Sequence, residues 1–250
     1  MSSLKETRDI MGMPIAVEIV GDGSQEVLEM IFAHFAHIDE VFSPYKPESA
    51  VSRINRGELT LAAASDEVQY IYNAAEKTRK ETGGAFNHRH KDGTIDPSGI
   101  VKGWAIQQAA KLLRARNSIN FCIDAGGDIQ TSGSNSDDTP WSVGIRHPFE
   151  TNKIAKIVYP KGRGVATSGT YLRGRHIYDP STGMAVDTPY VSLSVIGPDV
   201  YDADRFATAA FAMGERGLHF IENLFGYEAY AITHTSQAFF TSGFDEYTKP

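Results

Sequence analysis

The spacing of apolar residues changes character once along this chain of 250 residues, close to Asn117. Before that point the helical period dominates, as in 24–42, where apolar residues recur every three or four positions. Beyond it come short runs rich in β-branched and aromatic residues, such as 190–196, separated by Gly, Asp and Pro turns. Strands are also expected at 14–20 and 228–233, a helix between a capping Ser65 and Gly83–Gly84, and further helices near 202–213 and 218–225. Helices first, strands next and mixed elements last predict an α+β fold, with a mixed, mostly antiparallel sheet and flanking helices, rather than a regular βαβ repeat.

The length of the chain allows one large domain or two small ones. The polar loop 132–139 has no feature of a domain linker, and the sequence contains no internal repeat. We therefore expect a single domain that extends over residues 1–250.

The charge pattern excludes some classes of partner. The formal net charge is −7, and Lys and Arg form no cluster, which argues against a general nucleic-acid binder. No stretch approaches the roughly 20 apolar residues of a membrane span, so we expect no membrane insertion. Residues 1–6 contain neither the apolar core of a secretion signal nor a cysteine that could carry a lipid. A cytoplasmic location is the default expectation, although a chain trimmed of its leader would read the same.

Cysteine and histidine offer little metal chemistry here. Cys122 is the only cysteine, so an intramolecular disulfide is impossible, and its apolar neighbours predict a buried, inert thiol. His88 and His90 lie two residues apart on a loop with no third ligand in view, which argues against a zinc site.

The turn Asp-Pro-Ser-Gly-Ile-Val-Lys-Gly at 96–103 is typical of a phosphate site. A helix that begins with Ser98 as its N-cap would point its free N–H groups and its positive dipole end at the turn. Lys102 lies one turn into that helix and could reach over the same end. The alternative is an ordinary capping turn beside a solvated lysine.

Asp204 and Thr208 lie four residues apart on a predicted helix and therefore share one face. A carboxylate and a hydroxyl, with nearby carbonyl oxygens, form an oxygen-only set that suits Mg²⁺. The alternative is that Asp202 and Asp204 stabilise the helix N-terminus while Thr208 packs inside.

Two further segments combine small and polar residues. Paired glycines in Asp124-Ala-Gly-Gly-Asp128 indicate either a tight turn with positive φ or backbone pressed against a ligand. The hydroxyls of Ala166-Thr-Ser-Gly-Thr170 could contact ribose or phosphate, or could belong to a polar turn. His176 and Asp179 could each accept a proton, although a lone histidine is more often structural.

Taken together and in this order, the segments resemble the ApbE family, the FAD:protein FMN transferases. The resemblance extends from residue 11 to about residue 243 and depends on six segments in fixed order rather than on any one of them. The segments are 42–55 (FSPYKPESAVSRIN), 96–104 (DPSGIVKGW), 125–128 (AGGD), 166–169 (ATSG), 176–180 (HIYDP) and 203–208 (ADRFAT).

The resemblance implies a reaction: with Mg²⁺, the family moves the FMN half of FAD onto a Thr or Ser hydroxyl of an acceptor flavoprotein and releases AMP. It also implies a metal set of Asp204, Thr208 and the backbone carbonyl of Gly99. The residues that would contact FAD are Met11, Tyr45, Asp96, Lys102, Thr167, Ser168 and Gly169.

Such a transfer needs positive charge on the diphosphate and a base for the acceptor hydroxyl. His176 and Asp179 are the candidate bases. Two rival functions share most of these residues: a FAD pyrophosphatase, in which water replaces the protein hydroxyl, and a flavin carrier without catalysis.

The chain departs from the family pattern near the flavin side of the expected pocket. Only nine residues, 87–95, separate Phe86 from Asp96, whereas larger members carry a longer segment there. Asn87 stands where Asp is common, and Gly99 replaces a frequent Ala, which a carbonyl ligand should tolerate.

Overall fold

The computed structural model describes residues 1–150, 152–170 and 188–250. Within these residues, eight strands form one sheet in the order β1-β2-β3-β4-β7-β8-β9-β10, in which neighbouring strands pair antiparallel, and β5 and β6 form a separate hairpin. The strands are β1 (Ser3–Ile10), β2 (Met13–Val20), β3 (Asn120–Ala125), β4 (Asp128–Ser132), β5 (Val143–Arg146), β6 (Ile154–Val158), β7 (Gly164–Gly169), β8 (Tyr190–Gly197), β9 (Glu228–Thr233) and β10 (Ala238–Phe240). The helices are α1 (Gln25–Phe42), α2 (Ala50–Asn55), α3 (Asp66–Glu81), α4 (Ser98–Ala115), α5 (Val200–Ala212) and α6 (Glu215–Glu222), with short 3-10 turns at Leu61–Ala63 and Phe244–Tyr247.

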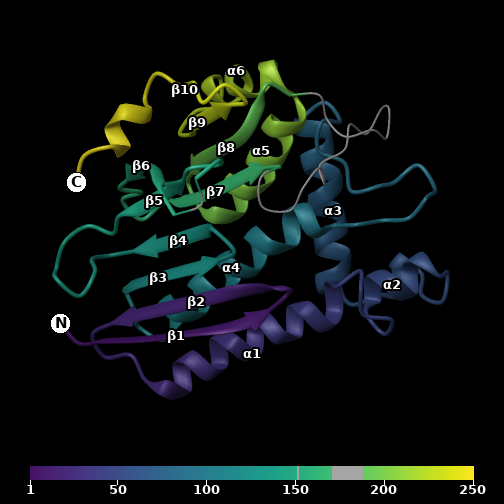
Figure 1. Cartoon of the computed structure of the whole chain (residues 1–250). Helices are drawn as coiled ribbons and strands as arrows, with labels where there is room; N and C mark the ends of the chain where they lie inside the picture. The colour runs from purple at the N-terminus through teal and green to yellow at the C-terminus, as the bar shows by residue number, and fades with distance from the viewer. Residues whose placement is uncertain (151, 171–187) are drawn as a thin grey trace.

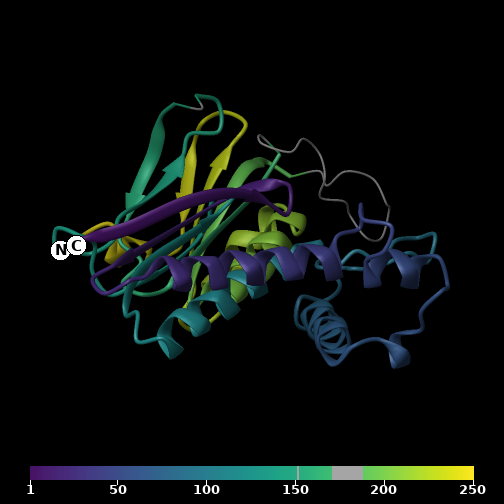
Figure 2. The same ribbon diagram turned by 90° about the horizontal axis from the view of Figure 1, so that it is seen from below.

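Helices α1, α4 and α5 cover one face of the sheet, and α2 and α3 extend beyond its end (Figure 1). In the view from below, α1 and α4 run side by side under the sheet, while the β5–β6 hairpin stands on the other face (Figure 2). The expected α+β class, with a mostly antiparallel sheet and flanking helices, is confirmed. The extent of the domain over residues 1–250 stays a prediction.

Buried apolar side chains form three groups that hold these layers together. One lies between β2, β3 and the helices α1, α3 and α4, the second between α5, α6 and strands β7–β9, and the third under the β5–β6 hairpin. The helical face of the sheet thus carries two of the three groups. Within the described residues, no helix is both long and apolar enough to span a bilayer.

Local signals set most helix boundaries. The Ser24 hydroxyl accepts a hydrogen bond from the Val27 N–H at 3.3 Å, which caps α1. Helix α3 begins after Ser65 and ends at Glu81, two residues before Gly83 and Gly84, whose φ angles are positive. These elements were predicted from the sequence, as were β2 and β9, within one or two residues.

The prediction that Ser98 caps α4 is wrong. Pro97 takes the cap position, and Ser98 is the first helical residue. The Asp96 carboxylate does the capping instead, because its Oδ1 accepts the Ser98 N–H at 2.9 Å and is also bonded to the Ser98 hydroxyl. Proline is well suited to this place, since the start of a helix leaves N–H groups without helical partners.

Strand β1 is absent from the sequence-based prediction. Its sequence, SLKETRDI, is mostly charged and polar, so its apolar residues show neither the helical nor the strand spacing. It forms because it pairs along its whole length with β2, from Ser3 opposite Val20 to Ile10 opposite Met13. Pairing with a buried neighbour has overridden a weak local signal.

A buried histidine, His88, lies in the segment between α3 and α4. His88 is 1% exposed, its ring packs edge-on against Tyr72 at 5.4 Å between centroids, and neither ring nitrogen has a hydrogen-bond partner among the described residues. Burial, with a smaller contribution from Arg89, lowers the pKa of His88 from 6.5 to about 4. The ring is therefore neutral at physiological pH.

We expect this histidine to destabilise the fold in acid. The unfolded chain gains a proton near pH 6.5 and the folded chain only near pH 4, so stability falls as pH decreases across that window, by up to roughly 3 kcal/mol. His88→Phe should make the unfolding free energy less dependent on pH between 6.5 and 4, measured by urea titration at several pH values. His90→Gln, at an exposed position on the same loop, should keep the wild-type slope. Equal slopes for His88→Phe and wild type would contradict this prediction.

Candidate functional site

Helices α4 and α5 approach each other closely at one glycine. A β-carbon built at Gly103 would lie 2.7 Å from the Asp204 β-carbon and 2.9 Å from the Val200 carbonyl oxygen, both too close for any side chain. The Gly103 N–H donates a 2.8 Å hydrogen bond to Asp204 Oδ2. The backbone of α4 therefore holds the Asp204 carboxylate directly.

Three charged side chains meet at this contact. Lys102 Nζ lies 2.5 Å from Asp128 Oδ2 and 3.7 Å from Asp204 Oδ1. Asp128 is 1% exposed and Asp204 4% exposed, while the lysine side chain keeps 17% of its surface. We call Lys102, Asp128 and Asp204 the charged cluster. Lys102 thus turns toward the protein, which rules out the alternative of an ordinary solvated lysine.

The charged cluster carries an excess of negative charge. Burial raises the pKa of Asp204 well above its usual range, and nearby Asp128 adds to this rise, while Lys102 and the Gly103 N–H oppose it. Two buried carboxylates share one ammonium group, so a further cation would lower the electrostatic cost of ionising both. Neighbouring Arg205 does not fill this role, because it pairs with Asp202 at 2.7 Å and with Glu81 on α3.

Strand β7 contributes one hydroxyl group to this site. Ser168 Oγ lies 3.3 Å from Thr208 Oγ1, one turn of α5 beyond Asp204. The Thr167 N–H donates to Asp128 Oδ1 at 3.1 Å, whereas the Thr167 side chain faces the other side of the sheet, where its hydroxyl lies 2.7 Å from Ser194 Oγ on β8. Strand β7 is therefore tied to the charged cluster by the Thr167 backbone and carries the Ser168 hydroxyl beside it.

The candidate metal residues come together. A β-carbon at Gly99 would lie 3.6 Å from Thr208 Cγ2, so the first turn of α4 faces Thr208 on α5. Asp204 and Thr208 share one face of α5, as the four-residue spacing predicted. Among the described residues no group of three or more His, Cys, Asp or Glu side chains could hold a metal. A cation held by the candidate residues would be bound by the Asp204 carboxylate together with hydroxyl and carbonyl oxygens, a donor set that fits Mg²⁺.

Met11 occupies a strained turn at the same end of the sheet. Met11 and Gly12 join β1 to β2 with φ angles of 56° and 70°, the two positive values of a type I′ hairpin. A long side chain with positive φ is uncommon and often marks a functional position. The Gly126 N–H bonds to the Pro14 carbonyl at 3.0 Å, which places the Gly126–Gly127 turn next to this hairpin.

Three further candidate residues belong to the described part of the chain and lie outside the charged cluster. Asp96 caps α4, the helix that carries Lys102. Tyr45 follows α1 and is 92% exposed. Gly169 ends β7, opposite Ser192. His176 and Asp179, the candidate bases, lie outside the described residues.

Asp128 is a site residue that was not predicted from the sequence. The paired glycines in 124–128 predicted a tight turn or backbone pressed against a ligand, and the turn does have positive φ at Gly126 and Gly127. The available signal was a carboxylate directly after paired glycines and before an apolar strand, where a charged group must find a partner on burial.

Comparison with known proteins identifies the family. The family model described as "ApbE family" matches residues 11–92 and 88–231. The chain belongs to the ApbE family.

Several relatives have named activities. The chain is 34% identical over 134 residues to a FAD:protein FMN transferase of Vibrio cholerae, covering 50% of this chain and 40% of that protein. It is 29% identical over 156 residues to one of Escherichia coli, covering 59% of this chain and 44% of that protein. The matched part of the chain thus spans less than half of either relative.

Solved ApbE structures share the fold over their whole length. The flavin transferase ApbE from Vibrio cholerae superposes with a TM-score of 0.87 at 22% identity and covers 98% of this chain and 99% of that one. The ApbE protein from Thermotoga maritima gives a TM-score of 0.88 at 20% identity, with complete coverage of both chains. At this level of identity the likeness establishes the ApbE fold and nothing finer.

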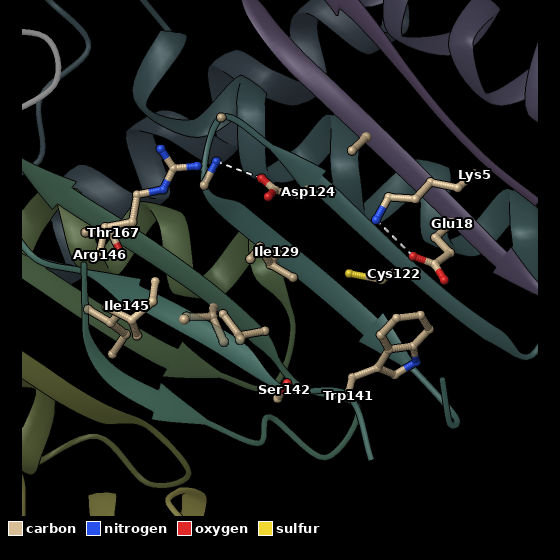
Figure 3. Close-up of a pocket in the computed structure, with 17 residues that line it drawn as sticks. Lys5, Glu18, Cys122, Asp124, Ile129, Trp141, Ser142, Ile145, Arg146 and Thr167 are labelled. Carbon is tan, nitrogen blue, oxygen red and sulfur yellow. Dashed lines mark hydrogen bonds and ion pairs between the residues drawn. The ribbon is translucent and has the colours of Figure 1, made fainter. Parts of the chain in front are cut away.

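This ApbE-family chain also has a cavity on the other face of its sheet. It has a volume of about 390 Å³ and lies between β2–β4, β7 and the β5–β6 hairpin. Asp124 and Arg146 lie at one end and Trp141 at the other, with Lys5 and Glu18 paired along the wall (Figure 3). None of the three residues of the charged cluster lines it.

Cys122 forms part of the floor of this cavity (Figure 3). Cys122 is partly exposed, whereas the sequence predicted a buried thiol. Burial of the sulfur still raises the pKa of the thiol to about 12, so it stays protonated and inert, as expected.

The close approach at Gly103 gives a stability prediction. Gly103→Ala should destabilise the chain by about 1–3 kcal/mol, because backbone atoms of α5 block the new methyl group, although alanine favours helices. Gly99→Ala on the same helix meets the edge of the Phe86 ring at 3.0 Å and the Thr208 methyl group at 3.6 Å, both side-chain atoms, and should cost less. Chemical denaturation of both variants provides the measurement. A Gly103→Ala chain as stable as wild type would contradict the packing described here.

Proposed function

We propose that this chain is a Mg²⁺-dependent FAD:protein FMN transferase, which moves FMN from FAD onto a Thr or Ser hydroxyl of an acceptor flavoprotein and releases AMP. The charged cluster, with Thr208, Ser168 and Gly99 beside it, is the main support. It lies in a chain of the ApbE family whose curated relatives carry this activity in their names. FAD and the acceptor flavoprotein are the proposed partners, with no role for nucleic acid. The cytoplasmic location stays a prediction.

The metal set proposed is Asp204, Thr208 and the carbonyl oxygen of Gly99. A carbonyl oxygen has two lone pairs, so Gly99 can serve a cation and still take part in the helix. A bound Mg²⁺ would supply positive charge that offsets the diphosphate and the developing charge on the leaving AMP.

The residues proposed to contact FAD divide into two sets. Lys102, Thr167, Ser168 and Gly169 form the proposed phosphate side, where the Lys102 ammonium and the Ser168 hydroxyl would orient the diphosphate and Thr167 and Gly169 would contribute backbone. Met11, Tyr45 and Asp96 form the flavin side, near the hairpin turn and the start of α4. Asp96 would act there partly through its cap, because it fixes the first turn of the helix that carries Lys102.

In the proposed reaction the acceptor hydroxyl oxygen attacks the phosphorus of the FMN half. A bond forms between that oxygen and phosphorus, the diphosphate bond to AMP breaks, and the hydroxyl proton passes to a base. His176 and Asp179 remain the candidate bases. Lys102 would hold the diphosphate in line for attack and stabilise charge in the transition state.

An assay with an acceptor separates the possible functions. The chain is incubated with FAD, Mg²⁺ and flavoprotein domains that carry a threonine acceptor site. We expect a fluorescent covalent adduct whose mass corresponds to added FMN, and one AMP for each adduct. AMP and free FMN produced without an acceptor would instead identify a pyrophosphatase. FAD binding without any turnover would identify a carrier.

Asp204→Asn tests the cation ligand within the same assay. The amide keeps the shape of the side chain but removes its charge, so transfer should fall by about 10²–10³-fold while FAD affinity changes little. Asp202→Asn, on the same helix and paired with Arg205, is the matched control and should retain transfer. Transfer at the wild-type rate in Asp204→Asn would remove Asp204 from the mechanism.

Lys102→Ala tests the phosphate contact. Loss of a charge-assisted contact to the diphosphate typically costs about 1.5–3 kcal/mol, so FAD should bind about 10- to 100-fold more weakly. Fluorescence titration with FAD measures this, and Lys111→Ala, which lies farther along α4 on an exposed position, is the control. Equal FAD affinity in Lys102→Ala and wild type would exclude Lys102 from the site.

A further inference from the structure

Asp128 joins three elements through one buried carboxylate. It is the first residue of β4, and its Oδ1 accepts the Thr167 N–H of β7 at 3.1 Å. Its Oδ2 lies 2.5 Å from Lys102 Nζ of α4. With only 1% of its surface exposed, the side chain is held from both sides and has little freedom to move.

The lysine lies between two carboxylates at unequal distances. Its 2.5 Å separation from Asp128 is a direct ion pair, whereas the 3.7 Å separation from Asp204 Oδ1 is too long for a hydrogen bond. The other Asp204 oxygen, Oδ2, already accepts the Gly103 N–H. Asp204 Oδ1 is therefore the oxygen whose availability depends on where the ammonium lies.

We propose that Asp128 is a positioning residue that holds the Lys102 ammonium off Asp204 and so keeps Asp204 open to a divalent cation. This inference rests on the proposed function, because it takes Asp204 as a cation ligand. With Asp128 charged, the ammonium and its partner form a pair that is neutral as a unit. Without that charge, Asp204 Oδ1, at 3.7 Å, is the next carboxylate oxygen within the described part of the chain, and an ammonium drawn toward it would occupy the place of the cation.

Asp128→Asn tests the positioning directly. The amide oxygen can still accept the Thr167 N–H, so the contact between β4 and β7 is preserved while the charge is lost. We expect Mn²⁺ to bind at least tenfold more weakly to the variant than to the wild-type full chain. Electron paramagnetic resonance of free Mn²⁺, without FAD, measures binding independently of turnover.

The double variant Lys102→Met/Asp128→Asn separates positioning from direct coordination. It removes both charges of the Lys102–Asp128 ion pair, so no ammonium remains that could move toward Asp204. Under this proposal Mn²⁺ affinity returns to within about threefold of wild type. If Asp128 were itself a cation ligand, the double variant would stay tenfold or more weaker than wild type, and the proposal would be overturned.

Asp124→Asn is the matched control. Asp124 lies on the other side of the same glycine turn, where its Oδ1 accepts the Gly127 N–H at 2.8 Å, and its replacement should leave Mn²⁺ affinity within twofold of wild type. Thermal melting must show that all variants fold. A wild-type chain that binds no Mn²⁺ would overturn this inference, whereas intact Mn²⁺ binding without flavin transfer to any acceptor would overturn the proposed function alone.

Discussion

The charge balance around Lys102 is the constraint on which the rest of the site depends. Burying two carboxylates is costly unless each has a partner, and here one ammonium serves both while backbone N–H groups take the remaining oxygens. This solution needs α4, α5 and the end of the sheet within a few ångströms of one another. Gly103 makes that spacing possible, because any side chain there would separate α4 from Asp204.

The sequence predicted those parts of the fold that depend on local signals. The period of α1, the glycines that follow α3 and the short apolar run of β9 each depend on a few neighbouring residues. The spacing of Asp204 and Thr208 is also local, since a helix of any kind places them on one face. For the same reason the turn around Gly126 and Gly127 was predictable, because paired glycines favour positive φ.

What could not be predicted depends on residues far apart in the chain. Strand β1 exists because β2 lies beside it, and nothing in its own charged sequence indicates this. The role of Asp128 was hidden because its partners, Lys102 and Thr167, are distant from it in sequence. The cap of α4 was misplaced by one residue: Pro97 takes the cap position, and the Asp96 carboxylate bonds the Ser98 N–H that a capping side chain would otherwise take.

The phosphate side and the flavin side of the candidate site differ in how far their side chains are fixed before a ligand binds. On the phosphate side, Asp128, Asp204 and Ser168 are buried and fixed by hydrogen bonds before any ligand arrives, which is the preorganisation that charge stabilisation requires. On the flavin side, Tyr45 presents almost its whole ring to solvent, and Met11 lies in a turn whose positive φ is unfavourable for its side chain. An exposed aromatic ring gains most when a flat apolar ligand covers it. A dinucleotide would therefore find its diphosphate position already formed, while its ring would complete the other half of the pocket by binding.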